Sequence, residues 1–462
     1  MDKTLKQSNS RLLLLLVVLV LSFTVRGLTM RFVRDHLADP GWFQSGTYAL
    51  FDRQAQNTLD GKTSAFWIDD PSRTEAAVYA PGYSLWLAFI YKATGERSAY
   101  VVQIVQWVLD ALSVMFIVGV GATAFGFRVG LVGGVLAALA PVLALYGVTP
   151  LAEAPTSWLV VGGVWMLLLA AKRQSPWWAL SAGMLLGASC WLRANAVLLA
   201  LSWGVALFFC VRNSWDKRLR LSLGVILGAA LLIVPLVIRN AVAFRAFVPT
   251  GLGMGTNLWE GIGETDRAAE FGAVIGDSLL LEQERKELGL PPNAPLGLYW
   301  PDGIERDRAR TRKALRVIAA HPLWYSKVML RRMWGMLKFA GAPLPYYGSM
   351  GINVTGKKTL PESWQGSLFA LPVTLLGMAQ SVFRYLALPL IIAGLWRGFH
   401  ISRSLTWLLL ATILYYLVLG STLHMEIRYG LPMQSLLMVF AGLGVVHLVQ
   451  FIRTSAVRPQ KS

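Results

Sequence analysis

Ten long runs of apolar residues, each with few or no charges, make up most of the chain. A membrane-spanning helix needs about 20 such residues, because the hydrocarbon core is about 30 Å thick and each helical residue rises about 1.5 Å. The pattern therefore predicts an all-α polytopic membrane protein with about ten transmembrane helices, within a range of about nine to twelve. The predicted spans are residues 12–30, 99–121, 127–147, 152–171, 176–192, 194–211, 221–239, 371–397, 404–421 and 430–452.

Three of these spans have unusual features. The first has the basic start and Leu-rich centre of a signal peptide, but no small-residue cleavage site follows, so we expect a retained anchor. The fifth and sixth nearly touch at Leu192-Arg193-Ala194-Asn195, which predicts a tight re-entry on one side of the membrane. Arg384 interrupts the eighth, so the number of crossings around 366–397 stays open: the stretch before Arg384 is either part of the span or an amphipathic helix in the interface.

Two long segments between the spans, at about residues 31–98 and 240–370, are rich in Trp, Tyr and Phe. Such residues gather where a chain lies on the bilayer surface. We therefore divide the chain into an N-terminal bundle with the first long loop (1–240), an interfacial segment (241–370) and C-terminal helices (371–462). Glu305 to Phe339 has apolar residues at helical spacing and a basic opposite face, which predicts one or two interfacial helices, either anchoring to anionic lipid or facing a lipid-linked phosphate.

The distribution of charge predicts the orientation of the spans. Lys and Arg mark cytoplasmic loops, and with a cytoplasmic N-terminus every inside segment carries basic residues. Of the 25 Asp and Glu residues, 22 then fall on the outer side, where carboxylate chemistry is expected. We therefore expect a multi-pass protein of the plasma (inner) membrane that works in the cell envelope, with its active site on the extracytoplasmic face.

The composition agrees with a membrane protein and disfavours other classes. The chain is 55% hydrophobic and 15% charged, whereas a soluble domain is about 25% charged. A soluble enzyme, a disordered chain and a nucleic-acid binder are therefore disfavoured. The net charge of +18 is assigned to topology and to contact with anionic lipid, and no nucleic-acid partner is expected. Cys190 and Cys210 lie in apolar runs and are interpreted as small core hydrophobes.

Sites for metals and nucleotides have little support. The five histidines are scattered, and neither H-x-x-x-H nor C-x-x-C occurs. No cofactor is predicted with certainty, although a divalent ion bound by carboxylates stays open because such ions need only oxygen ligands. The run Gly251-Leu-Gly-Met-Gly255 lacks the strand–turn–helix context of a dinucleotide site and is interpreted as loop flexibility.

Acids and arginines recur at the outer mouth of the bundle. Glu153 opens the fourth span, where it either complements the helix dipole or acts as a base or ion ligand. Asp110 lies inside the second span and is expected to be a structural hydrogen-bond partner. The arginines at this mouth serve either as snorkelling anchors or as phosphate ligands; they are Arg26, Arg31, Arg34, Arg193, Arg239, Arg245, Arg384 and Arg428. Together, these groups suit transfer of a sugar from a lipid phosphate, which the arginines hold while a carboxylate deprotonates the acceptor hydroxyl.

Six motifs along nearly the whole chain are similar to those of one family. They are Ala55-Gln-Asn-Thr-Leu-Asp-Gly61, Tyr79-Ala-Pro-Gly-Tyr-Ser-Leu-Trp-Leu-Ala88, Glu153 at the start of its span, Trp191-Leu-Arg-Ala-Asn-Ala-Val-Leu-Leu199, Arg239-Asn240 with Phe247-Val-Pro249 and Asn257-Leu258, and Glu426-Ile-Arg-Tyr-Gly-Leu-Pro432. With these motifs the chain resembles polytopic glycosyltransferases of the GT-C fold, the group related to the dolichyl-phosphate-mannose-protein mannosyltransferases and to lipid A aminoarabinose transferase.

The resemblance implies a large outer cavity, a polyprenyl-phosphate-sugar donor and a catalytic Asp in the first outer loop. Thr47 stands where the family has that Asp, so Asp52 and then Asp39 are the candidate bases. Glu153 carries over as a second acid or as the ligand of a divalent ion. The residues expected to bind the lipid phosphate or the sugar are Arg428, Arg193, Tyr83 and Arg239.

The function predicted on these grounds is that of an integral membrane glycosyltransferase, moving a hexosyl or pentosyl group with inversion. Its donor is a polyprenyl-phosphate sugar, and its acceptor is a lipid, a glycan or a protein. The alternative is a transporter or flippase of lipid-linked glycan intermediates. Transporters usually show internal repeats, and this chain shows none.

Overall fold

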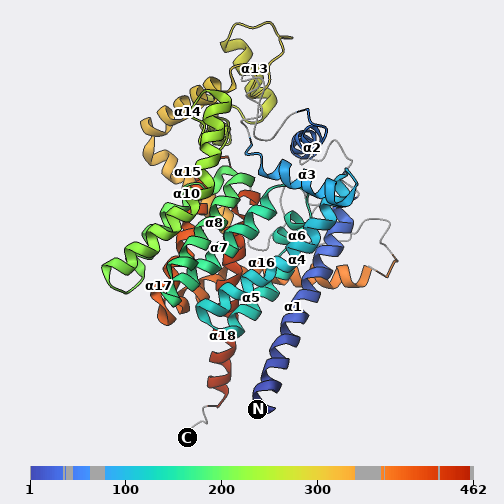
Figure 1. The fold of residues 1–462 in the computed structure, drawn as a ribbon, viewed down its shortest axis with the longest axis vertical. Helices are drawn as coiled ribbons and strands as arrows, with labels where there is room; N and C mark the ends of the chain where they lie inside the picture. The colour runs from blue at the N-terminus through green and yellow to red at the C-terminus, as the bar shows by residue number, and fades with distance from the viewer. Residues whose placement is uncertain are drawn as a thin grey trace.

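A computed structural model describes residues 2–34, 37, 45–62, 79–338, 366–368, 370–424 and 427–457. These residues form helices joined by short connections, with one isolated bridge between Gly297 and Trp300 and no strand among them. The expected all-α polytopic architecture is therefore confirmed (Figure 1).

Six helices of the described chain are long and apolar enough to cross a membrane. They are α1 (Asp2–Arg34), α4 (Ala99–Phe125), α7 (Glu153–Arg173), α10 (Trp215–Phe244), α17 (Arg403–Thr422) and α18 (Leu431–Val457). Two further crossings are bent, which gives up to eight: α5 (Phe127–Leu139) meets α6 (Pro141–Gly147) at 66°, and α16 (Ala370–Ile401) bends by 48°. The predicted fifth and sixth spans are the shorter α8 (Pro176–Leu192) and η2 (Ala194–Ala196) with α9 (Leu199–Cys210). Every predicted span thus coincides with helical structure, but only six to eight candidate crossings are found in the described chain, so the predicted number of about ten is not confirmed.

The two long loops also fold into helices. The first contains α2 (Ser45–Leu59) and α3 (Gly82–Thr94). The second contains α11 (Met254–Gly263), α12 (Ala268–Phe271), α13 (Asp277–Glu287), α14 (Gly303–Ala320) and α15 (Pro322–Lys338). The last two helices cover the segment from Glu305 that the sequence assigns to one or two helices.

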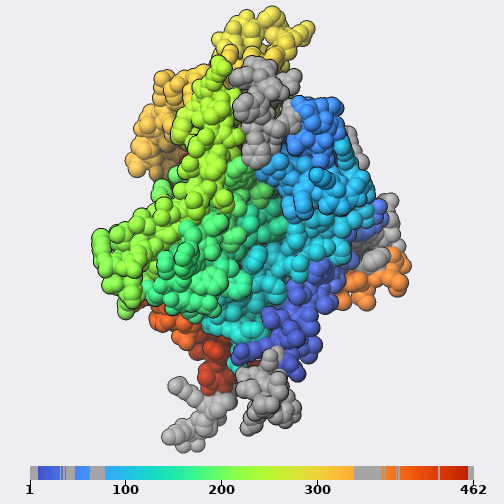
Figure 2. Space-filling model, viewed as in Figure 1, coloured from blue at the N-terminus to red at the C-terminus, as the bar shows by residue number. Residues whose placement is uncertain are grey.

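These loop helices gather at one end of the molecule, which we call the loop end. Figure 1 shows α2, α3, α13 and α14 at this end, whereas the start of α1 and the end of α18 lie at the opposite end. The space-filling view shows the same upper surface, with the first loop on one side of α10 and the second loop on the other (Figure 2). Both described chain ends therefore lie at the same end of the bundle.

Glycines allow the membrane helices to pack backbone against backbone. A Cβ at Gly183 of α8 would lie 2.0 Å from the carbonyl oxygen of Val225, and one at Gly228 of α10 would lie 2.2 Å from that of Leu180. The pair α16 and α18 makes the same contact through Gly394, where a Cβ would lie 1.8 Å from a carbonyl oxygen. Because lipid tails are as apolar as leucine, close packing of this kind rather than the hydrophobic effect holds membrane helices together.

A carboxylate from another helix caps the start of α11. Asp307 of α14 accepts hydrogen bonds from the backbone N–H groups of Gly255 (3.1 Å) and Thr256 (3.3 Å), two of the donors that a helix start leaves without a partner. Gly253 has φ +106, and a Cβ at Gly255 would lie 2.1 Å from the carbonyl oxygen of Asp307. The glycine-rich run that the sequence assigns to loop flexibility therefore has a definite role: it lets α14 approach α11.

Candidate active site

Glu153 and two arginines form a buried cluster at the loop end of the bundle. Glu153 opens α7 and is 3% exposed. Its Oε1 pairs with Nη1 of Arg193, at the C-terminal cap of α8, and lies 3.4 Å from Nε of Arg428, in η5 (Ile427–Gly430). Its Oε2 has no hydrogen-bond partner among the described residues. Three elements that are distant in sequence thus converge on one carboxylate, and we call Glu153, Arg193 and Arg428 the Glu153 cluster.

Local backbone structure fixes the two arginines. The chain is extended at Arg193 (φ −149, ψ 137), so α8 ends there and the side chain turns toward Glu153, at the tight re-entry that the sequence predicts. The hydroxyl of Tyr415 donates to the carbonyl oxygen of Asn195 (2.8 Å), and Asn195 Nδ2 donates to that of Tyr429 at 3.5 Å. The turn that carries Arg193 is therefore tied to the turn that carries Arg428.

The described contacts of the cluster join two guanidinium groups to one carboxylate. Both guanidinium groups lie over the ring of Tyr429, with the central carbon of Arg193 at 4.6 Å and that of Arg428 at 5.4 Å from its centroid. An aromatic face attracts cations, which helps to hold two like charges in one place. Guanidinium groups that lie close together suit a phosphate, because each presents several N–H donors.

Tyr79 lies beside this cluster, and the sequence analysis did not select it. Burial raises the pKa of its hydroxyl, whereas the nearby positive charge of Arg193 lowers it. Its ring packs on Phe51 of α2, with centroids 4.8 Å apart. A Cβ at Gly82 would lie 2.4 Å from the carbonyl oxygen of Trp191, so this glycine lets the start of α3 rest on the end of α8. The Tyr79-Ala-Pro-Gly motif is the sequence feature that points to Tyr79, but the residue predicted from this motif was Tyr83.

Tyr83 lies in the same region with its hydroxyl turned away from the arginines. It is fully buried and donates to Oε1 of Gln106 (3.0 Å). The amide of Gln106 donates in turn to the carbonyl oxygens of Thr149 (3.3 Å) and Leu151 (3.1 Å), just before Glu153. Through these contacts Tyr83 supports the turn that positions Glu153, and its hydroxyl is not brought to the cluster.

Asp52 belongs to a separate hydrogen-bond network between α2 and α3. Its Oδ1 accepts from the hydroxyl of Tyr91 (2.6 Å), and its Oδ2 accepts from Nε2 of Gln56 (2.8 Å). The hydroxyl of Tyr48 lies 2.6 Å from that of Tyr91, and burial raises the pKa of both phenols. Phe51, the neighbour of Asp52, packs against Tyr79, so this network adjoins the Glu153 cluster without joining it.

The other predicted site residues lie elsewhere. Asp39 lies outside the described residues. Thr47 lies in α2. Arg239 donates to Oδ1 of Asn240 (2.7 Å) and lies over the ring of Phe244 at 5.6 Å, both on its own helix α10. The described contacts of Glu153 do not include Arg239.

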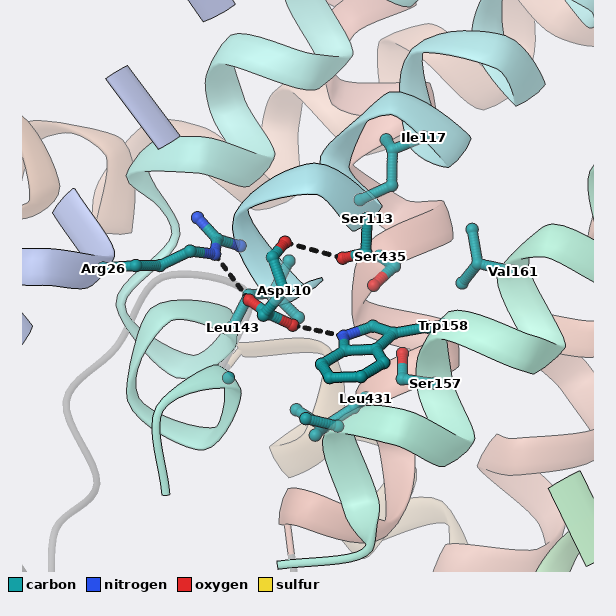
Figure 3. A pocket seen from close by; sticks show the side chains of 12 residues that line it. Arg26, Asp110, Ser113, Ile117, Leu143, Ser157, Trp158, Val161, Leu431 and Ser435 are labelled. Carbon is teal, nitrogen blue, oxygen red and sulfur yellow. Dashed lines mark hydrogen bonds and ion pairs between the residues drawn. The ribbon is translucent and has the colours of Figure 1, made fainter. Parts of the chain in front are cut away.

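Arg26 has a different role from the outer-mouth arginine that the sequence predicts. It is 1% exposed in α1, and its Nε pairs with Oδ2 of Asp110 in α4 at 2.5 Å. Figure 3 shows the Asp110 carboxylate between Arg26 and the indole of Trp158, which donates to Oδ1 at 2.5 Å. A cavity of about 20 Å³ adjoins the pair, which is room for about one water molecule. The structural role expected for Asp110 is met, with Arg26 as its partner.

A second group of buried charges lies between α13 and α14. Glu284 accepts from both Arg310 (2.6 Å) and Arg306, beside a pocket of about 130 Å³ that also includes Trp259 and Lys313. Burial alone would raise the pKa of Glu284, but the hydrogen bonds from the two arginines lower it overall. The further donors of these arginines end on carbonyl oxygens of the 297–301 loop and, for Arg310 Nη1, on the hydroxyl of Thr256 (3.0 Å), so this group ties the loop to α11 and α14.

The surroundings of Glu153 do not fit a divalent cation. Its described charged partners are two guanidinium groups, which repel a metal ion. Nowhere in the described parts of the chain do three His, Cys, Asp or Glu side chains form a group suited to a metal. The ion suggested for Glu153 stays an untested prediction, and no chemical step below depends on it.

Comparison with known proteins agrees with this architecture. Residues 78–238 match the family described as dolichyl-phosphate-mannose-protein mannosyltransferase. The fold is similar to that of the archaeal oligosaccharyltransferase AglB from Archaeoglobus fulgidus, in a complex with an inhibitory peptide and a dolichol-phosphate. There the TM-score is 0.53 at 12% identity, covering 98% of this chain and 53% of AglB. The apo form of the oligosaccharyltransferase from the same organism gives 0.51 at 13% identity, covering 97% of this chain and 52% of that one. No curated protein sequence matches the chain.

The chain therefore shares its fold with these oligosaccharyltransferases, and residues 78–238 match the mannosyltransferase family. Both comparisons agree with the resemblance and the all-α polytopic fold expected from the sequence motifs. The chain spans about half the length of the solved structures that it matches.

Proposed function

We propose that this protein transfers a sugar from a polyprenyl-phosphate donor to an acceptor at the extracytoplasmic face of the plasma membrane. The matched family is described by a dolichyl-phosphate-mannose donor and a protein acceptor, and the AglB complex contains a dolichol-phosphate and a peptide. These comparisons support a lipid-phosphate donor and make a protein acceptor the first to test. Glycan and lipid acceptors belong in the same assay.

The observation that carries the proposal is the convergence of Arg193 and Arg428 on Glu153, beside the start of α3. Arg193 and Arg428 supply fixed guanidinium donors to the donor phosphate, and Glu153 holds them in place. Arginine stays charged at any physiological pH and presents paired N–H groups. The phenol of Tyr79 adjoins the same two arginines and can donate to the phosphate as well. The site then stabilises the charge that builds up on the phosphate as it leaves.

The transfer itself needs a base and no redox partner. The acceptor hydroxyl attacks the anomeric carbon and inverts it, while the bond from that carbon to the phosphate oxygen breaks and its electron pair stays with the polyprenyl phosphate. A carboxylate in the first loop takes the hydroxyl proton. Asp52 is our first candidate because it adjoins the cluster through Phe51, and Asp39 is the second.

The test uses the purified full chain in nanodiscs, supplied with polyprenyl-phosphate sugars and with peptide, glycan and lipid acceptors. We expect Arg193→Gln and Arg428→Gln to raise the KM for the donor by about 10- to 100-fold, because a charge-assisted hydrogen bond is worth about 1.5–3 kcal/mol. Arg312→Gln is the matched control, since Arg312 is an exposed arginine of α14. Asp52→Asn or Asp39→Asn should abolish transfer while leaving insertion and folding intact.

Two results would reject parts of this proposal. Normal transfer by both Asp variants, separately and combined, would show that neither Asp52 nor Asp39 is the catalytic base. If Arg312→Gln and Arg428→Gln change the donor KM equally, Arg428 is not part of a phosphate site. The change then reflects a general effect of surface charge.

A further inference from the structure

Leu423 and His424, which follow α17, rest directly on the end of α11. A Cβ added at Gly261 would lie 3.0 Å from both the His424 nitrogen and the Leu423 carbonyl carbon. The His424 N–H donates to the carbonyl oxygen of Asn257 at 2.8 Å. No side chain separates the two backbones at Gly261, and the described chain resumes at Ile427, immediately before Arg428.

Arg332 of α15 joins both sides of this contact. Its Nη1 donates to the carbonyl oxygens of Ser421 and Leu423, each at 3.1 Å, at the end of α17. Its Nη2 donates to the carbonyl oxygen of Gly261, at the end of α11, and to Oε2 of Glu264 at 3.0 Å. Carbonyl groups at helix ends lack intrahelical donors, and one guanidinium supplies donors to two helix ends together. Arg332 is 8% exposed, so water competes little for these bonds.

Glu264 and His424 form a second link between α11 and the residues that follow α17. Oε1 of Glu264, the C-terminal cap of α11, lies 2.6 Å from Nδ1 of His424. Glu264 therefore contacts Arg332 with one oxygen and His424 with the other. We call Arg332, Glu264 and His424 the α11 clamp. It links three elements, α11, α15 and the segment after α17, and it lies outside the contacts of Glu153 described above.

We propose that the α11 clamp is a positioning device for Arg428 and thereby sets the affinity of the site for the donor phosphate. This inference rests on the proposed function. Arg428 lies in a single turn of 3-10 helix and reaches Glu153 at 3.4 Å only while that turn is held. Ordering the turn costs conformational entropy, and the clamp removes that cost before the donor arrives. Glu264 and His424 act through Arg428 and do not touch the substrate.

A double-mutant cycle on lipid-phosphate binding tests this inference. The full chain in phosphatidylcholine nanodiscs is titrated with undecaprenyl phosphate. Glu264→Gln keeps the size of the side chain but removes its charge, and we expect it to weaken binding about tenfold. His424→Gln should act similarly from the other side. In an Arg428→Gln background, neither change should weaken binding further, because residues that act through one another are not additive.

Turnover and folding measurements separate positioning from general damage. With a sugar donor, Glu264→Gln should raise the donor KM about tenfold, with kcat within about twofold and the acceptor KM unchanged. The matched control is Glu282→Gln, which removes an exposed pair with Lys286 on α13 and should change none of these values. Thermal unfolding of each variant shows that the chain is folded, and His424→Gln replaces Glu264→Gln if the latter does not fold.

The outcomes distinguish this inference from the proposed function. If wild type does not bind undecaprenyl phosphate, both the proposed function and the clamp's role are overturned. If wild type binds but Glu264→Gln and His424→Gln bind equally well, only the clamp's role is overturned. The same holds if the effects of Glu264→Gln and Arg428→Gln multiply, because the clamp then acts without Arg428.

Discussion

The partners of each buried charge distinguish structural ion pairs from the candidate active site. Arg26 and Asp110 form a one-to-one pair, so no charge is left for a ligand. Glu153 is shared by two arginines. Two arginines also share Glu284, and carbonyl oxygens of the 297–301 loop and the hydroxyl of Thr256 occupy their further donors. A buried charge is tolerated only when it is paired and hydrogen-bonded, and under the proposed function the two arginines beside Glu153 also pair with the donor phosphate.

Glu260 gives a pH prediction at the residue scale. It is 8% exposed, and burial, followed by the nearby charge of Asp277, raises the pKa of its carboxyl from 4.5 to about 7. An unfolded chain loses this proton near pH 4.5, whereas the folded chain keeps it. Stability should therefore fall as the pH rises from about 4.5 to about 7 and then level off, by up to about 3 kcal/mol.

Thermal unfolding of Glu260→Gln across this range tests the prediction. The variant cannot ionise, so we expect its stability to match that of wild type at pH 4.5 and to exceed it at pH 8. Glu282→Gln, an exposed acid on α13, serves as the control and should follow wild type. A wild type whose pH dependence equals that of Glu260→Gln would show that Glu260 ionises normally.

At the scale of elements, the break between α5 and α6 explains why a charged pair is kept inside the bundle. Pro141 opens α6 and cannot donate to the preceding turn. Two carbonyl oxygens at the end of α5 accept from side chains of other helices: Ala138 from Arg26 Nη1 (3.3 Å) and Leu139 from Gln380 (3.0 Å), near the bend of α16. Asp110 then neutralises Arg26. Side chains of neighbouring helices thus donate hydrogen bonds to the carbonyl oxygens at the break, as non-helical backbone in a membrane requires.

This account predicts the effect of removing either charge. Arg26→Met or Asp110→Leu alone should cost about 3–5 kcal/mol, because the other charge stays buried without its partner. The double variant should recover much of that loss, since neither charge is then present. Thermal unfolding in detergent measures the set, with Lys172→Met at the exposed end of α7 as control. A double variant as unstable as the two single losses combined would contradict the pairing.

Sequence reasoning located the elements better than the contacts between them. Apolar length identifies each crossing, and the basic amphipathic pattern identifies α14 and α15, because these signals are local. The pairing of Arg26 with Asp110 is not local: it depends on the depth of α1 beside α4. Glu153, Arg193 and Arg428 were each selected, but their convergence depends on how three chain turns meet. Tyr79 and Tyr83 are four residues apart in one motif, and only the packing of α3 shows that Tyr79 lies by the arginines.

At the scale of the whole molecule, the helices of both long loops lie at the end away from the described chain termini (Figure 1). The Glu153 cluster adjoins this end, because the start of α3 contacts the end of α8 just before Arg193. α10 spans this distance: with 30 residues it is about 45 Å long, and Phe244 at its end packs with Ile304 of α14. The start of α10 therefore lies at the other end of the molecule from α13 and α14. The distribution of Lys and Arg predicts that the loop end faces the extracytoplasmic side.

Cysteine labelling in intact cells tests this orientation. Cys190 and Cys210 are first replaced by alanine, and single cysteines are placed at two exposed lysines, Lys286 of α13 and Lys217 at the start of α10. We expect a membrane-impermeant maleimide to label Lys286→Cys in intact cells and Lys217→Cys only after the membrane is permeabilised. Both sites are exposed, so a difference in labelling reports the side of the membrane. The reverse pattern would place the Glu153 cluster on the cytoplasmic side, where the donor orientation and the mechanism proposed above would both fail.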